Sequence, residues 1–290
     1  MPLFSVVIPA YNRAHTLIKA VESVLGQSLA DYECIVVDDG STDTTYKELS
    51  PYRKKITYIP IPHGGVSKAR NAGIAASHGQ WIAFLDSDDV WQSKKLEAHY
   101  NYIQRHPQMV IHQTDESWIR QGKRVNPMKK HQKKEGDIFN ESLHLCLISP
   151  SAVVVHRSLF DTVGLFDEKL PVCEDYDLWL RVTWQYHVGF IPDKLIVKYG
   201  GHADQLSSQC WGMDRFRVYA ICKLLACYGS KLQAQQYTMA VEVALSKCRI
   251  LLHGAKKHSN VTLAQKVTRV MEWLTADRQS MQAFPDLVEG

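Results

Sequence analysis

Three carboxylates follow the apolar run 81–85 within four positions: Asp86, Asp88 and Asp89. Short apolar runs of this kind are typical of buried strands. Like charges this close repel one another, and a hard divalent cation bound through oxygen would relieve the repulsion. At the carboxyl end of a strand in an α/β chain, such a cation would lie where phosphorylated ligands bind. The alternative is a solvated acidic turn, since Asp and Ser suit turns.

A second acidic group, formed by Glu174, Asp175 and Asp177, begins a segment that becomes apolar at Leu178. The spacing predicts a helix over residues 173–181 with these carboxylates in its first turn. The helix dipole favours negative charge at that end. The carboxylates therefore either stabilise the helix alone or are available to a site.

The first third of the chain alternates short apolar runs with segments of helical spacing. Strands are predicted at 4–9, 32–37, 56–59 and 81–85, with helices at 16–27, 42–49 and 67–77 between them. This alternation predicts βαβ units and a mostly parallel sheet flanked by helices, hence an α/β fold. The carboxyl ends of parallel strands lie on one edge of a sheet, so polar residues that follow them can form one site. These polar groups are residues 11–13, 38–39 and 86–88.

The pattern is weaker in the second half. A helix is predicted at 96–106, followed by an irregular region at 107–150, a strand at 152–155 and two short strands within 188–199. From residue 211 onward only helical periodicity remains, with apolar residues on one face of each run. We therefore predict an α/β domain at 1–210 and a helical C-terminal extension at 211–290, packed on that domain.

Length and composition are those of an ordinary globular protein. We find no run of about 18 apolar residues and no N-terminal signal pattern. The seven cysteines are odd in number and scattered, which favours a reducing compartment over a disulfide framework or a zinc site. A cytoplasmic location is therefore expected. The net charge of +4 is too small to indicate nucleic-acid binding.

Basic residues are concentrated in the stretch 123–134, which includes Lys123, Arg124, Lys133 and Lys134. A run of like charges usually forms a solvated loop. Such a stretch could instead contact anionic lipid headgroups at the inner membrane surface, or a phosphorylated acceptor. A peripheral membrane contact therefore stays open.

Five motifs occur in order along the chain: VVIPAYNR at 6–13, VVDDGSTD at 36–43, GVSKARNAG at 65–73, FLDSDD at 84–89 and EDYDLWLR at 174–181. Together they resemble the inverting family 2 glycosyltransferases, which have the GT-A fold. Each motif alone is weak, but five in this order are specific, and the resemblance extends to about residue 207. The Q-x-x-R-W signature of processive polysaccharide synthases is absent, which favours transfer of a single sugar.

The resemblance implies that the donor is a nucleotide-diphosphate sugar with UDP as its nucleotide. Asp39 would then face the base, although an Asp before a glycine also suits a turn. Arg70 would hold a phosphate or a base carbonyl with its planar guanidinium, although a surface helix also accounts for an arginine there. The residues expected to bind the nucleotide sugar are Pro9, Tyr11, Arg13, Asp39, Arg70, Asp86 and Ser87.

The resemblance also implies a metal ion and a general base. Asp88, assisted by His202, would bind Mn²⁺ or Mg²⁺, and the ion would neutralise the charge that develops on the departing diphosphate. Asp175 would take the proton of the acceptor hydroxyl on the face opposite the leaving group, as the base of an inverting glycosidase does for water. Glu174 would bind the acceptor, a glycan or a lipid-linked oligosaccharide.

Two other functions remain open from the sequence. The spacing of Asp86, Asp88 and Val90 also fits haloacid-dehalogenase-like phosphatases, in which Asp86 would be the nucleophile and Asp88 the acid/base. That motif normally closes the first strand of its domain, whereas three predicted strands precede it here. The chain could also be a non-catalytic sugar-nucleotide binding module. A dinucleotide dehydrogenase is disfavoured, because no G-x-G-x-x-G follows the first strand.

Overall fold

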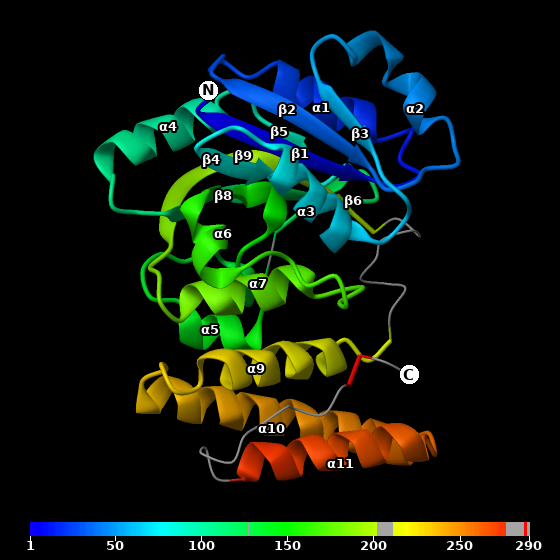
Figure 1. Cartoon of the computed structure of the whole chain (residues 1–290), viewed down its shortest axis with the longest axis vertical. Coiled ribbons are helices and arrows are strands. Elements are labelled where there is room, and N and C mark those ends of the chain that lie inside the picture. The colour runs from blue at the N-terminus through cyan, green and yellow to red at the C-terminus, as the bar shows by residue number, and fades with distance from the viewer. Residues whose placement is uncertain (127, 202–210, 277–286, 289–290) are drawn as a thin grey trace.

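The computed structural model describes residues 1–126, 128–201, 211–276 and 287–288, and its centre is one nine-stranded sheet (Figure 1). Its first four strands lie in the order β3-β2-β1-β4, and all neighbours among them are parallel. Each of the four lies within one residue of its predicted bounds. They are β1 (Phe4–Ala10), β2 (Tyr32–Asp38), β3 (Thr57–Pro60) and β4 (Trp81–Phe84).

Helices cover both faces of this parallel part. The even-numbered side chains of β1 pack against α1 (Leu17–Leu25), whereas Val7 packs against α3 (Val66–Ala76). Strands buried on both faces need a nearly continuous apolar run, which explains the sequence pattern. The helix α3 lies so close that a Cβ at Gly73 would be 2.3 Å from Val7 Cγ1. Glycine at this position therefore fixes how tightly α3 is held against the sheet.

The second half of the sheet is mixed. After β4 the order continues with β8 (Val153–His156), β6 (Ile111–Arg120), β9 (Gly189–Gly200) and β5 (Val90–Trp91), and β7 (Lys123–Val125) pairs with β6. The strand β8 is antiparallel to both β4 and β6, whereas β6 and β9 are parallel. The predicted α/β class is confirmed, and the parallel arrangement describes its first four strands.

The prediction that residues 107–150 are irregular is wrong, because the ten-residue strand β6 lies within them. The strand lacks an apolar pattern, since His112, Gln113, Thr114 and Glu116 are polar yet buried. Each of the four makes a hydrogen bond to a residue outside β6. Buried polar groups are tolerated when they are hydrogen-bonded, so hydrophobicity does not reveal this strand.

The two short strands predicted within 188–199 are a single strand, β9. The register of its pairing with β6 shifts between Ile191 and Lys194. Pro192 lies in that bulge, where the regular pairing is interrupted. The ladder therefore needs no hydrogen bond from a backbone N–H at this position. A proline that suggests a break in the sequence is thus accommodated without ending the strand.

The remaining helices of the sheet domain are short. They are α2 (Thr45–Glu48), α4 (Lys95–Arg105), α5 (Phe139–His144), α6 (Ser158–Val163) and α7 (Glu174–Thr183), with 3₁₀ turns at Ser50–Tyr52, Lys129–His131 and Pro150–Ala152. In the described part of the chain, no helix has both the length and the apolar character needed to cross a bilayer. The cysteines that the structure places are free thiols.

Three helices make up the C-terminal part of the described chain: α9 (Asp214–Tyr228), α10 (Ala234–Lys257) and α11 (Val261–Thr275). Figure 1 shows them stacked below the sheet domain, with α9 between α10 and the helices α5 and α7. One apolar cluster joins Phe139 of α5 and Tyr176 of α7 to the buried faces of all three helices. The division at residue 210 stays a prediction, since the two parts share this core.

Candidate active site

A cleft of about 360 Å³ opens where β1 and β4 end and α7 begins. Its volume is in the range of small-molecule sites. Segments far apart in the sequence meet there, as expected for the carboxyl edge of a parallel sheet. Tyr11 and Asp39 do not line it, and His202 lies outside the described residues. The predicted residues that do line it are Pro9, Arg13, Arg70, Asp86, Ser87, Asp88, Glu174 and Asp175.

Arg70 connects three of the elements that meet at the cleft. Its side chain is 4% exposed, and it donates from Nη2 to Asp86 Oδ1 at 2.8 Å and from Nη1 to Glu174 Oε1 at 2.5 Å. Burial alone would lower the pKa of Arg70, but these two carboxylates raise it. Burial also raises the pKa of Glu174 to about 7, although Arg70 opposes that shift. The ion pairs tie α3, the end of β4 and the start of α7 together.

Asp175 lies in the first turn of α7 and is partly exposed to the cleft. Its Oδ1 accepts a hydrogen bond from the backbone N–H of Tyr176 at 2.7 Å, and its Oδ2 accepts one from the thiol of Cys146 at 3.4 Å. Burial, and then the charge of Asp175, raise the pKa of Cys146, which keeps the thiol protonated as a donor. No motif includes Cys146, so sequence analysis missed it.

The three carboxylates that follow β4 have different surroundings. Asp86 is in the ion pair just described. Asp89 is buried, where its Oδ2 accepts from Ser151 Oγ at 2.6 Å and its Oδ1 from the N–H of Tyr199 at 3.3 Å. Burial raises the pKa of Asp89 to about 8. Asp88 is partly exposed and lines the cleft. The charges of Asp86 and Asp88 contribute to the raised pKa of Asp89, so the three groups still interact although their surroundings differ.

The chemistry of the donor set allows a divalent cation at Asp88. Among the residues that the structure describes, no group of three or more His, Cys, Asp or Glu side chains is arranged to hold a metal ion. Mg²⁺, however, is commonly bound by one or two carboxylates, with substrate phosphates and water as its remaining ligands. A single carboxylate open to a cleft fits that mode of binding.

Lys198 is a cleft residue that no motif predicted. It lies on β9, and its ammonium group interacts electrostatically with Asp89, Glu116, Asp86 and Asp175. Burial alone would lower the pKa of Lys198, but these carboxylates raise it. The cleft therefore combines acids with fixed positive charge, which suits an anionic ligand such as a diphosphate. Its cationic side chains are Arg13, Arg70, Lys198 and Arg217.

Tyr11 and Asp39 are outside the wall of this cleft. The ring of Tyr11 stacks on His63 with 4.0 Å between centroids. Asp39 is buried, and its two carboxylate oxygens accept from the backbone N–H groups of Gly64 and Gly65, each at 2.8 Å. Asp39 therefore shapes the loop before α3. Its contact with a nucleotide base stays a prediction.

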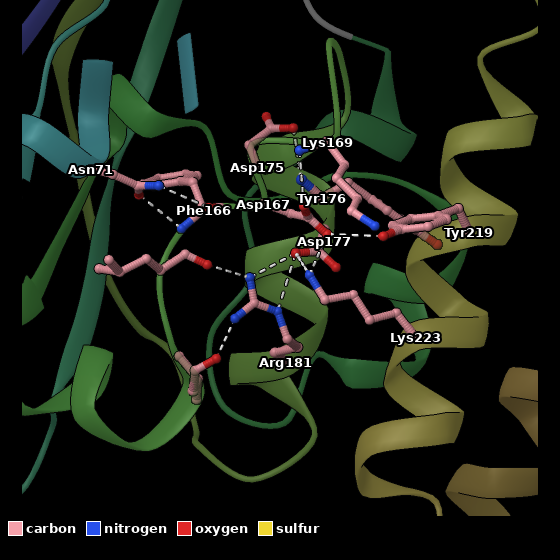
Figure 2. A network of polar contacts seen from close by, with 12 residues as sticks. Asn71, Phe166, Asp167, Lys169, Asp175, Tyr176, Asp177, Arg181, Tyr219 and Lys223 are labelled. Carbon is pink, nitrogen blue, oxygen red and sulfur yellow. Dashed lines mark hydrogen bonds and ion pairs between the residues drawn. The ribbon is translucent and has the colours of Figure 1, made fainter. Parts of the chain in front are cut away.

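A charge network holds the other side of α7 (Figure 2). Asp177 Oδ2 accepts from Arg181 Nη2 at 2.7 Å and from Lys223 Nζ at 3.2 Å. Lys223, on α9, also donates to Asp167 at 2.6 Å, and Arg181 donates to two backbone carbonyls at the end of α6. Figure 2 shows Asp175 pointing away from this network. Neighbouring acids of one motif thus face the cleft and the helical extension separately.

The basic stretch 123–134 is only partly a surface feature. The side chain of Lys133 is 4% exposed and lies 3.3 Å from Glu116 Oε2. Its Nζ donates to the carbonyl of Leu147 and to Ser149 Oγ, each at 3.1 Å. The expectation of a wholly solvated loop is wrong for Lys133, because a buried carboxylate on β6 attracts it inward. The basic residues earlier in the stretch are exposed.

Glu116 makes the fold sensitive to acid. Burial alone would raise its pKa, but Lys133, Lys198 and hydrogen bonds from Ser149 and Trp118 lower it to about 2. An unfolded glutamate titrates near its ordinary pKa of 4.5, so the unfolded state binds more protons between these two values. The free energy of unfolding therefore falls as the pH drops from about 4.5 toward 2, and we expect Glu116 to contribute about 3 kcal/mol to that loss.

Urea unfolding of the wild type and Glu116→Gln at about pH 6, 4 and 3 tests this expectation. The variant should be less stable at the highest pH, where it lacks the ion pair, and should lose less stability on acidification. Glu135→Gln, at an exposed position, should keep the acid dependence of the wild type. Parallel pH profiles for Glu116→Gln and the wild type would show that another group causes the acid loss.

The sequence is similar to those of known glycosyltransferases. Residues 5–164 match the family model "Glycosyl transferase family 2". The uncharacterized glycosyltransferase RP339 of Rickettsia prowazekii is 31% identical over 212 residues, which are 71% of this chain and 66% of that protein. The UDP-Glc:alpha-D-GlcNAc-diphosphoundecaprenol beta-1,3-glucosyltransferase WfgD of Escherichia coli is 33% identical over 203 residues, 66% of this chain and 76% of that protein. The chain spans less than two thirds of the length of its rickettsial relatives.

The fold is also that of a solved structure, S. aureus TarS 1–349 in complex with UDP-GlcNAc. The superposition has a TM-score of 0.64 and covers 92% of this chain and 90% of that one, with 18% sequence identity. An identity this low supports an inference about the fold alone. It confirms the prediction of a GT-A-type α/β domain with a helical C-terminal part.

Proposed function

The chain belongs to glycosyl transferase family 2, and from this premise we propose that it transfers one sugar from a UDP-sugar to its acceptor with inversion at the anomeric carbon. The acceptor would be a glycan or a lipid-linked oligosaccharide. The observation that carries the proposal is the single cleft lined by both Asp88 and Asp175. The proposed reaction uses one carboxylate to bind a metal ion beside the diphosphate and a second carboxylate to take the proton of the acceptor.

In this proposal Asp175 takes the proton of an acceptor hydroxyl while that oxygen attacks the anomeric carbon. The bond from this carbon to the diphosphate breaks on the opposite face, and its electron pair leaves with the UDP. The thiol of Cys146 and the backbone N–H of Tyr176 donate hydrogen bonds to the carboxylate of Asp175 and orient it in the first turn of α7. Arg13 and Lys198 provide positive charge in the wall of the cleft where the negative leaving group forms.

A divalent ion is general in this family, and we propose Mn²⁺ or Mg²⁺ here. Asp88 would be its ligand from the described part of the chain, and His202 a second ligand. Such an ion supplies Lewis-acid neutralisation of the diphosphate charge. Asp86, which is paired with Arg70, would hold the ribose or a metal-bound water.

Positions for the nucleotide and for the acceptor follow from the same arrangement of residues in the cleft. We propose that the nucleotide lies toward Tyr11 and Asp39, and that Glu174 helps to hold the acceptor through the oxygen that Arg70 does not engage. The name of WfgD specifies a diphosphoundecaprenol-linked acceptor, which supports a lipid-linked acceptor for this chain too. A cytoplasmic enzyme in peripheral contact with the inner membrane surface would suit such an acceptor, with the exposed part of the stretch 123–134 facing the lipid.

The other functions considered from the sequence fit less well. A haloacid-dehalogenase-like phosphatase would need Asp86 as its nucleophile, but the buried Arg70 engages that carboxylate. The strand before Asp86 is also the fourth of the sheet rather than its first. A non-catalytic binding module would bind the donor but never turn it over, so a turnover measurement distinguishes it from a transferase.

Donor binding is tested by a thermal-shift panel of nucleotide sugars with and without Mn²⁺. A ligand that binds only the native state stabilises it by about 2.7 kcal/mol when present at about 100 times its Kd. We expect one UDP-sugar to raise the Tm with Mn²⁺ present and less without it. Asp88→Asn should remove the Mn²⁺-dependent part, whereas Asp161→Asn, on the exposed side of α6, should retain it. No shift with any donor would contradict the proposal.

A further inference from the structure

A second pocket lies in the helical extension, between the first turn of α9 and the turn that joins α10 to α11. Figure 1 shows these two segments at the same end of the helical extension. Its volume is about 580 Å³, which is in the range of ligand sites. The reaction proposed above does not use it. Its wall is largely apolar and includes Trp211, Met213, Ile250, Leu251, Ala255 and Leu263.

This pocket adjoins the catalytic cleft. Met213 and Arg217 line both cavities, and they lie at the beginning of α9. A single extended ligand could therefore place one end in the cleft and the other in the pocket by passing these two side chains.

Two large apolar side chains of the pocket face solvent. Trp211 is 60% exposed and Ile250 is 61% exposed. Single exposed apolar residues are ordinary, but apolar groups gathered around one pocket are typical of a binding site. Both side chains would gain burial from an apolar ligand.

Positive charge lies at the junction between the two cavities. Asp214 Oδ1 accepts from Arg217 Nη1 at 2.9 Å and from Lys247 Nζ at 3.1 Å. Lys247 lines neither cavity but neutralises part of the charge of Asp214, so the charge of Arg217, which lines both cavities, is only partly compensated. A pocket that is apolar along its length and cationic at one end matches an amphiphile whose phosphate follows an apolar chain.

We propose that this pocket binds the alkyl or isoprenoid chain of a lipid phosphate acceptor, with the phosphate near Arg217 and the acceptor sugar at Asp175. The inference rests on the proposed transfer function and adds a lipid subsite to it. It also gives a role to the core that the extension shares with α5 and α7. That core fixes the distance between the lipid pocket and the general base.

Decyl phosphate, kept below its micelle-forming concentration, tests the pocket without any transfer activity. Calorimetry on the full chain should show it binding ~100-fold more tightly than methyl phosphate, because each buried methylene adds affinity. Ile250→Asp should weaken decyl phosphate binding ~10-fold or more, since it places a charge in an apolar wall. Val261→Asp is the matched control, because Val261 is similarly exposed, at 65%, but lies outside this pocket.

Arg217→Gln should weaken the binding of decyl phosphate but not that of uncharged decyl maltoside. Equal binding of decyl and methyl phosphate, or equal effects of Ile250→Asp and Val261→Asp, would overturn the proposal. So would a solution dimer that Ile250→Asp dissociates, or binding seen only after removal of residues 277–290, because the occupant would then be a second copy or the chain's own C-terminal segment. The UDP-sugar thermal shift is measured separately, so a failure of donor binding and a failure of the lipid pocket are distinguishable.

Discussion

Asp175→Asn is expected to lower the rate of sugar transfer about 10³-fold while the protein still binds its donor. Asparagine has nearly the same shape as aspartate, and its one side-chain oxygen can still accept the hydrogen bond that Tyr176 donates, although the bond from Cys146 to the second oxygen is lost. It cannot take a proton from the acceptor hydroxyl, so the rate of the chemical step should fall while donor binding is retained. The release of UDP in the presence of acceptor measures this step, and the donor-induced rise in Tm measures binding.

Glu174→Gln separates the role of the base from that of its neighbour. This variant loses the charge that pairs with Arg70, so we expect lower stability and a higher KM for the acceptor, with kcat reduced less than in Asp175→Asn. A rate for Asp175→Asn within about threefold of the wild type would show that another group accepts the proton. If the same variant lost the donor-induced shift instead, Asp175 would belong to donor binding.

The acids of the cleft could be predicted because local signals mark them. An apolar run ends at Asp86 and Asp88, and an acidic first turn begins the helix that carries Asp175. Each signal depends on neighbours in the sequence, and the parallel order of the strands then brings the ends together. The fold class follows from the same alternation of strands and helices.

Lys198 and Cys146 could not be predicted in the same way. Lys198 reaches the cleft because β9 pairs with β6 and β5, and β6 itself is hidden by its buried polar residues. Cys146 meets Asp175 only through the packing of the segment after α5 against α7. Both placements depend on tertiary contacts between segments that carry no motif, so no local pattern reports them.

The helix α7 links the cleft to the helical extension. Its first turn presents Asp175 to the cleft, and two residues later, about half a turn around the helix, Asp177 faces Lys223 of α9 (Figure 2). The extension therefore contacts the same short helix that carries the proposed base. Any change that loosens the contact between Asp177 and Lys223 is expected to act on the position of α7 as well as on stability.

Asp177→Asn is expected to lower the free energy of unfolding by about 3 kcal/mol or more. Asp177 is fully buried, and its Oδ2 accepts from both Arg181 and Lys223. Removing its charge leaves the Arg181 guanidinium, which is 5% exposed, without a compensating anion. Urea unfolding of the wild type and the variant at neutral pH measures the difference.

Asp167→Asn is the matched control, because Asp167 also pairs with Lys223 but carries no contact to Arg181. It lies nearer the surface, and we expect its replacement to cost about 1 kcal/mol or less. Equal stability of the two variants would show that the network stabilises the fold mainly through Lys223 and not through the buried pair of Asp177 and Arg181. Lys223 keeps Asp167 as its partner in Asp177→Asn, so the double variant Asp177→Asn with Lys223→Met measures how much of the lost stability comes from the pair of Asp177 and Lys223. A purely additive result would mean that Arg181 alone bears the cost of losing Asp177.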